Sequence, residues 1–242
     1  MKEKELYYEV SDEVFAQFPG YTRGVVLAYD VRNGDSPGEL VSLLRGAEAS
    51  LRERLDTDAL ASDPRITAWR EAYRSFGAKP SKFRPSMEAM ARRVLKDQQL
   101  PSISALVDIG NVVSLGHLVP AGGHGTDVLT EDMALRLATG DEEFVPFGSD
   151  KVEHPLPGEI ILVEGNTVLT RRWTWRQANH TLLLPTTTDL EFNVDGLPPV
   201  EIEEIEQACA EIAELVERFC GGSFRIEVIT KDNPKIRLDG AV

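Results

Sequence analysis

Cysteine is scarce in this sequence, and long uncharged segments are missing from it. Among 242 residues only Cys209 and Cys220 are cysteines, and their spacing matches no metal-ligand pattern. We expect both to be buried in a helix, as free cysteines usually are. No segment has the roughly 20 predominantly apolar residues of a membrane span, and the N-terminus lacks the apolar run of a signal peptide. The sequence therefore predicts a cytoplasmic protein with no membrane partner.

Several well-known catalytic motifs are also missing. The chain contains no Gly-x-Ser-x-Gly, no P-loop, no dinucleotide-binding fingerprint and no His-Glu-x-x-His. The spacing of its histidines from one another and from Asp108 or Asp127 matches no standard set of metal ligands. We therefore expect neither a metal ion nor another cofactor.

Positive charge is scarce overall but concentrated in one segment. The net charge of −14 disfavours general affinity for nucleic acid, because phosphate contacts supply most of that binding. Residues 65–96, however, contain a basic island: Arg65, Arg70, Arg74, Lys79, Lys82, Arg84, Arg92, Arg93 and Lys96. Glutamates dominate the segment 201–217 instead. Two interpretations stay open: two solvated helix faces, or a polyanion-binding surface on an acidic protein.

Hydrophobic periodicity predicts helices in the first half of the chain and strands in the second. Apolar residues at steps of three and four predict a helix over 37–56, a short helix ending at Gly77, another after Ser86, and a helix at Ile202–Phe219. Gly24–Val31 is expected to be a buried strand. Alternation from Asp132 onward predicts a hairpin that turns at Gly165-Asn166, followed by strands at Leu190–Val194 and Phe224–Ile229. We expect one α+β domain over 1–242, with a core at about 24–229 and a mixed, largely antiparallel sheet flanked by helices.

The most suggestive segment runs from Leu106 to Asp127 and ends in a Gly-Gly-His-Gly sequence. We expect a turn there, in which Gly122, Gly123 and Gly125 adopt angles closed to other residues and point amide N–H groups at a carbonyl or phosphate oxygen. His124 could orient or deprotonate a water molecule. A histidine in a flexible loop is the equally weighted alternative.

A polar stripe precedes that turn. If residues 103–115 form a helix, then Ser104, Asp108 and Asn111 share one face, opposite the core-facing Leu106 and Ile109. The stripe could be either a solvated face or part of a site.

A second cluster combines arginine with tryptophan: Arg171, Arg172, Trp173, Trp175, Arg176, Gln177 and His180. Arginine and tryptophan suit phosphate contacts and base stacking. The same pattern also fits an amphipathic strand with tryptophan inward and arginine outward. Asn193 and Asp195 follow on the strand that ends at Gly196.

Several short sequence motifs, taken in their order along the chain, resemble those of the B3/B4 domain of the phenylalanyl-tRNA synthetase beta subunit. They resemble its free-standing relatives more closely. They include AYRSFG at 72–77, Leu106-Val107-Asp108 with Asn111, Pro120-Ala121-Gly122-Gly123, and Trp173-Thr174-Trp175-Arg176-Gln177. The resemblance spans roughly Gly24 to Ile229. In the synthetase this domain hydrolyses the ester of tyrosine attached to the wrong tRNA, so the resemblance implies a tRNA-binding deacylase that acts in trans on mischarged tRNA.

The resemblance also implies roles for individual residues. Catalysis is assigned to His124, Asn193 and Asp195, and contact with the tRNA acceptor end or its aminoacyl group to Arg74, Arg84, Asp108, Asn111, Gly122, Gly123, Arg176 and Gln177. Three editing-site residues of the synthetase are replaced in this chain: its arginine aligns with Pro101, its histidine with Gly122 and its glutamate near Asn193. The alternatives are a non-catalytic module that binds tRNA, an amino acid or a nucleoside, and a small-molecule esterase.

Overall fold

The computed structural model describes residues 5–239 and contains helices and strands in a mixed order. The helices are α1 (Asp12–Gln17), α2 (Gly38–Arg54), α3 (Thr57–Ser62), α4 (Pro64–Ser75), α5 (Ser86–Val94), α6 (Ala105–His117) and α7 (Ile202–Cys220). The strands are β1 (Tyr7–Val10), β2 (Thr22–Tyr29), β3 (Ala121–Gly125), β4 (Met133–Leu137), β5 (Ile160–Glu164), β6 (Thr167–Arg171), β7 (Arg176–Gln177), β8 (Leu190–Gly196), β9 (Ser223–Ile229) and β10 (Lys235–Arg237).

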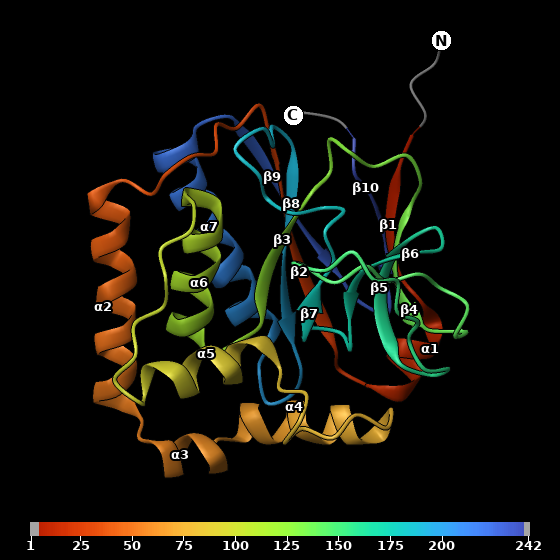
Figure 1. Ribbon diagram of the computed structural model, residues 1–242, viewed down its shortest axis with the longest axis horizontal. Helices are drawn as coiled ribbons and strands as arrows, with labels where there is room; N and C mark the ends of the chain where they lie inside the picture. The colour runs from red at the N-terminus through yellow and green to blue at the C-terminus, as the bar shows by residue number, and fades with distance from the viewer. Residues whose placement is uncertain (1–4, 240–242) are drawn as a thin grey trace.

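A four-stranded antiparallel sheet of order β3-β8-β2-β9 forms the centre of the molecule (Figure 1). Every residue of β2 and β8 is buried, because the sheet is covered on both faces. Helices α6 and α7 pack against one face, and α2 packs on the outside of α6. This places α6 beside β3, which is an edge strand of the sheet.

The second sheet has the order β10-β1-β4-β5-β6-β7 and lies on the other side of the central sheet (Figure 1). Its strands pair antiparallel except for β1 and β4, which run parallel. The hairpin of β5 and β6 turns at Gly165-Asn166, as its sequence predicts. The site described below lies where this sheet meets the edge of the first.

The α+β class with mixed and antiparallel pairing is confirmed, although the strands divide between two sheets. The amphipathic stripe of α7 lies against the central sheet as expected and buries Cys209, while Cys220 is buried at the end of the helix. The helix predicted at 103–115 begins at Ala105 and extends to His117. The short elements β1, α1, α3, β7 and β10 were not predicted from the sequence.

The domain boundaries expected from the sequence, 1–242, stay a prediction, and residues 1–4 and 240–242 lie outside the described residues. The buried core extends from Tyr8 to Leu238. Within the described range, no helix has the length and apolar character needed to cross a membrane.

Candidate functional site

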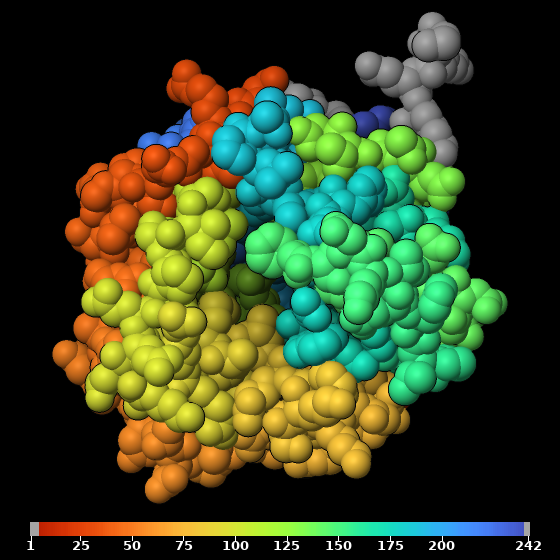
Figure 2. Space-filling view, in the orientation of Figure 1, coloured from red at the N-terminus to blue at the C-terminus, as the bar shows by residue number. Residues whose placement is uncertain are grey.

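A cavity of about 490 Å³ opens beside β3, between the first half of α6, residues 173–177 and the loop 182–184. Figure 2 shows the molecule hollowed at the middle of this face, with yellow-green residues on one side and green to blue residues on the other. Three exposed apolar side chains from separate segments line the mouth: Ile103, Phe147 and Leu184. The cavity is therefore assembled from parts of the chain that are distant in sequence.

The Gly-Gly-His-Gly segment is a strand and not a turn, which corrects the expectation from its glycines. Strand β3 pairs antiparallel with β8, and Gly122 lies opposite Asn193. Gly122, Gly123 and Gly125 all lie outside the positive-φ region. Pairing with β8 holds the backbone extended. The glycines therefore leave room beside the strand and do not adopt backbone angles closed to other residues. A Cβ atom on Gly123 would lie 2.8 Å from Leu183 Cδ1, whereas one on Gly122 would meet nothing within 4 Å.

One edge of β3 is available to a ligand. Asp195 N–H donates to Pro120 O, so the alternation of antiparallel pairing directs the N–H groups of Gly122 and His124 toward β8. The N–H of Gly123 then points away from β8. On that edge Gln177 Nε2 donates to Gly123 O at 3.0 Å, which fixes a cavity-lining side chain against the strand.

His124 lines the cavity but is only 4% exposed. Its Nδ1 lies 2.6 Å from Thr181 Oγ1 and 3.2 Å from Gln177 Nε2, and its Nε2 lies 3.1 Å from Thr170 Oγ1. The amide nitrogen Nε2 of Gln177 can only donate, so Nδ1 of His124 accepts and Nε2 of His124 carries the proton. Burial, with smaller effects of Arg23 and His180, lowers the pKa of His124 to about 3. The ring is therefore neutral, with both nitrogens hydrogen-bonded, and connects β3 to β6.

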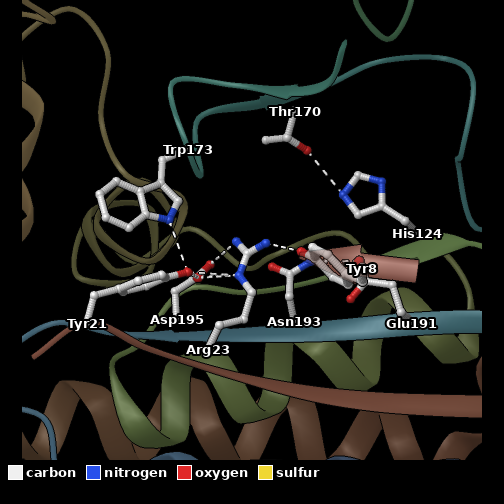
Figure 3. Close-up of polar contacts among 9 residues, drawn as sticks. All are labelled: Tyr8, Tyr21, Arg23, His124, Thr170, Trp173, Glu191, Asn193 and Asp195. Atoms are coloured by element: carbon white, nitrogen blue, oxygen red, sulfur yellow. Dashed lines mark hydrogen bonds and ion pairs between the residues drawn. The ribbon is translucent and has the colours of Figure 1, made fainter. Parts of the chain in front are cut away.

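Asp195 belongs to a buried ion pair behind the cavity. Arg23 Nε lies 2.8 Å from Asp195 Oδ1, and Nη2 lies 3.0 Å from Oδ2. Tyr21 donates its hydroxyl hydrogen to Asp195, Arg23 donates to Tyr8, and Trp173 Nε1 lies 3.4 Å from Tyr21 Oη. Figure 3 shows Arg23 between Tyr21 and Asp195 on one side and Tyr8 on the other. This network joins β1 of one sheet to β2 and β8 of the other, and Arg23 also lines the cavity.

Asn193 lines the cavity, and Glu191 lies beside it on β8. Asn193 Nδ2 donates to Glu191 Oε1 at 3.0 Å, while Glu191 Oε2 is buried with no hydrogen-bond partner among residues 5–239. Burial raises the pKa of Glu191 to about 8, since Arg23 and Asn193 offset desolvation only in part. Glu191 is thus protonated at neutral pH. Neither Glu191 nor Arg23 was identified from the sequence; Glu191 lies inside the predicted strand 190–194, and Arg23 comes just before the predicted strand 24–31.

The polar stripe of α6 divides between two environments. Asn111 lines the cavity, whereas Asp108 is fully buried and does not line it. Asp108 Oδ2 accepts from Ser36 Oγ at 2.6 Å and from Ser102 Oγ, and Oδ1 accepts from the N–H of Ile103 at 3.1 Å. Asp108 therefore fixes the segment that leads into α6. Since Ser104 and Asp108 are buried and Asn111 faces the cavity, the stripe is not a solvated face.

The arginine and tryptophan cluster is not one amphipathic strand. Strand β6 ends at Arg171, and Arg172 and Trp173 have φ angles of 49° and 62°, which turn the chain before β7. Arg171 forms a bidentate ion pair with Glu159 at 2.7 and 2.9 Å, and Trp173 is buried. The turn brings Trp175, Arg176 and Gln177 to the cavity wall. His180 lies apart from them and pairs with Glu164.

The basic island forms two clefts next to the cavity. A cleft of about 580 Å³ is lined by Arg70, Arg74, Lys79, Arg84 and Arg92 together with Glu88, and a cleft of about 450 Å³ by Lys82, Arg84, Arg92, Arg93, Lys96 and Trp175. Trp175 also lines the cavity, so the smaller cleft and the cavity share a wall. Most cations of the basic island are thus gathered in clefts formed by α4, α5 and the segment between them.

Sequence comparison decides the family: residues 68–221, more than half of the chain, match the B3/4 domain. The chain belongs to the B3/4 domain family. The resemblance inferred from its sequence landmarks is thereby confirmed. No curated protein matches the sequence significantly.

Among solved structures, this B3/4 domain protein is similar to an N-terminal fragment of the phenylalanyl-tRNA synthetase beta subunit from Pyrococcus horikoshii. The two share 12% sequence identity over 93% of this chain, with a TM-score of 0.44. The match covers 51% of the fragment, so this chain spans about half of its length.

The B3/4 match includes both basic clefts and nearly the whole cavity wall. Arg23 and its partners Tyr8 and Tyr21 lie before the matched residues. Arg23 of β2 thus adds a side chain to the cavity wall from outside the matched segment.

Proposed function

We propose that this B3/4 domain protein is an aminoacyl-tRNA deacylase that acts in trans and hydrolyses the ester of mischarged tRNA. The observation that carries the proposal is the shared wall at Trp175 between a cleft of cations and a mostly apolar cavity. An anionic strand in the cleft can place a small terminal group in the cavity. The acceptor end of an aminoacyl-tRNA has this combination of parts.

In the proposed complex the aminoacyl group enters the cavity and its ester lies along the free edge of β3. The N–H of Gly123 is a donor that could stabilise the oxyanion formed when water attacks the ester carbon. The side chains of Asn111, Asn193 and Gln177 could hold the attacking water or the amino group of the substrate. The terminal hydroxyl of the tRNA then takes part in proton transfer, because among the described residues no ionised base lines the cavity.

Of the other proposed site residues, some position their neighbours and the arginines contact phosphates. Neutral His124 is hydrogen-bonded to Gln177 and so holds this side chain and β3 in place. Asp195 fixes Arg23, which lines the cavity as Asn193 does. Asp108 positions the start of α6 and thereby Asn111. Arg74 and Arg84 contact phosphates in the clefts, and Arg176 does so at the cavity mouth.

A panel of tRNAs, each charged with a non-cognate amino acid, tests this function. The purified protein is expected to release the amino acid from at least one member faster than buffer does. Asn193→Ala should lower that release at least tenfold and leave affinity for uncharged tRNA unchanged. Absence of release from every member would contradict the proposal.

One observation favours a second candidate, a module that binds the acceptor end without hydrolysis. Among the residues that the structure describes, no carboxylate lines the cavity, and its histidine is neutral. Such a module would bind aminoacyl-tRNA more tightly than uncharged tRNA and leave the ester intact. Substitution of His124, Asn193 or Asp195 would change its affinity, whereas a deacylase would lose turnover.

A further inference from the structure

Trp175 differs from the other two tryptophans in its surroundings. Trp69 and Trp173 are each 1% exposed and pack edge to face with ring centroids 4.9 Å apart in the core. Trp175 is partly exposed and lines both the smaller basic cleft and the cavity. Trp173 also lines the cavity but is almost completely buried, so among the described residues Trp175 is the tryptophan that offers an exposed face to a ligand in the cleft.

The indole of Trp175 is held in a fixed position. Phe83 packs against it edge to face, with ring centroids 4.9 Å apart and an interplanar angle of 79°. The guanidinium carbon of Arg172 lies 4.5 Å from the centroid of Trp175 and 3.7 Å from that of Phe83. Arg172 Nη2 lies 3.5 Å from Glu159 Oε2, which restrains the guanidinium. A rigid aromatic surface loses little conformational entropy when a planar ligand stacks on it.

The cleft that leads to Trp175 has an unusual charge for this protein. Its wall carries five cationic residues (Lys82, Arg84, Arg92, Arg93 and Lys96) and no acidic residue, although the chain as a whole has a net charge of −14. In the described part of the chain, neither Lys82 nor Lys96 forms an ion pair. Free cations beside an aromatic surface are the combination that binds single-stranded nucleic acid, by phosphate contacts and by base stacking.

The geometry points to Trp175 as a stacking platform for an unpaired base near the end of an RNA strand, whose phosphates lie in the cleft of Lys82, Arg84 and Lys96. A base inside a duplex has both faces covered by its neighbours, so the site favours a flexible single-stranded end over a duplex. This inference rests on the proposed function, because it supplies the path by which the acceptor end reaches the cavity.

Intrinsic fluorescence of the full chain tests the platform with uncharged RNA, independently of hydrolysis. A short single-stranded RNA that ends in CCA is expected to quench the emission of Trp175 in a saturable manner. A blunt RNA duplex of the same strand should produce no quenching and bind at least tenfold more weakly. In Trp175→Leu the remaining emission of Trp69 and Trp173 should not respond, and single-strand affinity, measured by fluorescence anisotropy of a labelled RNA, should fall about tenfold. Trp175→Phe, which keeps a ring for stacking, should retain more of that affinity than Trp175→Leu.

Matched charge variants test the cleft. Lys96→Gln should weaken single-strand binding and lower the salt dependence by about one ion, whereas Lys231→Gln removes the same charge outside both clefts and should have no effect. Equal binding of single strand and duplex, quenching that persists in Trp175→Leu, or equal effects of the two lysine variants would overturn the inference. Hydrolysis of charged tRNA without quenching would refute the platform alone, whereas quenching without hydrolysis would refute the deacylase alone.

Discussion

Arg23 and Asp195 face each other across β2 and β8, joined by two contacts of 2.8 and 3.0 Å, and both side chains are almost completely buried. Replacing one partner leaves the other charge without compensation in the core. Arg23→Met and Asp195→Asn should each lower the free energy of unfolding by about 3–5 kcal/mol, measured by urea denaturation. The exposed pair Arg237 and Asp239 is the control, and its loss should change the free energy of unfolding far less than the loss of the buried pair. Losses below about 1 kcal/mol for both buried variants would show that the ion pair does not stabilise the fold.

Glu191 should make stability depend on pH. Its pKa is about 8 in the folded protein and 4.5 in a model compound, so the folded state retains a proton that the unfolded chain releases between these values. Stability from this group is complete below pH 4.5 and is lost as the pH rises through 8. The stability of Glu191→Gln relative to the unsubstituted protein should therefore increase by at least about 1 kcal/mol between pH 5 and pH 8. The exposed Glu203→Gln should show no such change, and a constant difference for Glu191→Gln would contradict its protonated state.

Neighbouring glycines of β3 should respond differently to alanine. At Gly123 a new methyl group would collide with Leu183 and Phe192, so Gly123→Ala should destabilise the protein by about 1–3 kcal/mol. At Gly122 the space is open, so Gly122→Ala should leave the midpoint of urea denaturation nearly unchanged. Equal effects at the two positions would contradict the described packing of β3.

The sequence predicts best those elements whose side chains pack regularly on one face. The sequence predicts the stripe of α7 and the hairpin of β5 and β6 because each apolar pattern repeats over enough residues to be distinguished from chance. Strands β1 and β10 are short and adjoin each other at one edge of their sheet, so their pattern is weak. The sequence suggests a turn in place of β3 because glycine has low strand propensity. The strand that pairs with β3, β8, also lies far along the chain.

The candidate site was predictable in position but not in detail. Asn111, Gly122, Gly123, Gln177 and Asn193 do meet around one cavity. Asp108 is buried by contacts with Ser36 and residues 102–103, Asp195 by its pair with β2, and His124 by its bond to β6, and no local pattern reveals these contacts. Only the assembled sheets show that these three side chains are already hydrogen-bonded or ion-paired within the protein.

The pH profile of hydrolysis should separate His124 from a general base. Because burial lowers its pKa to about 3, the ring stays neutral throughout pH 5–8. The rate of deacylation should therefore show no inflection near pH 6.5. An inflection near pH 6.5 that disappears in His124→Gln would mean that the histidine titrates during catalysis and would refute its assignment as a positioning residue.

The central claim is that the cavity beside β3 holds the aminoacyl group during hydrolysis, and Gly122→Val tests it most directly. The substitution places a branched side chain in open space on a strand, so the fold should persist while the cavity is filled. With the best substrate of the mischarged panel, we expect deacylation to fall at least tenfold while affinity for uncharged tRNA and the urea midpoint stay unchanged. Undiminished deacylation by a folded Gly122→Val protein would contradict the account.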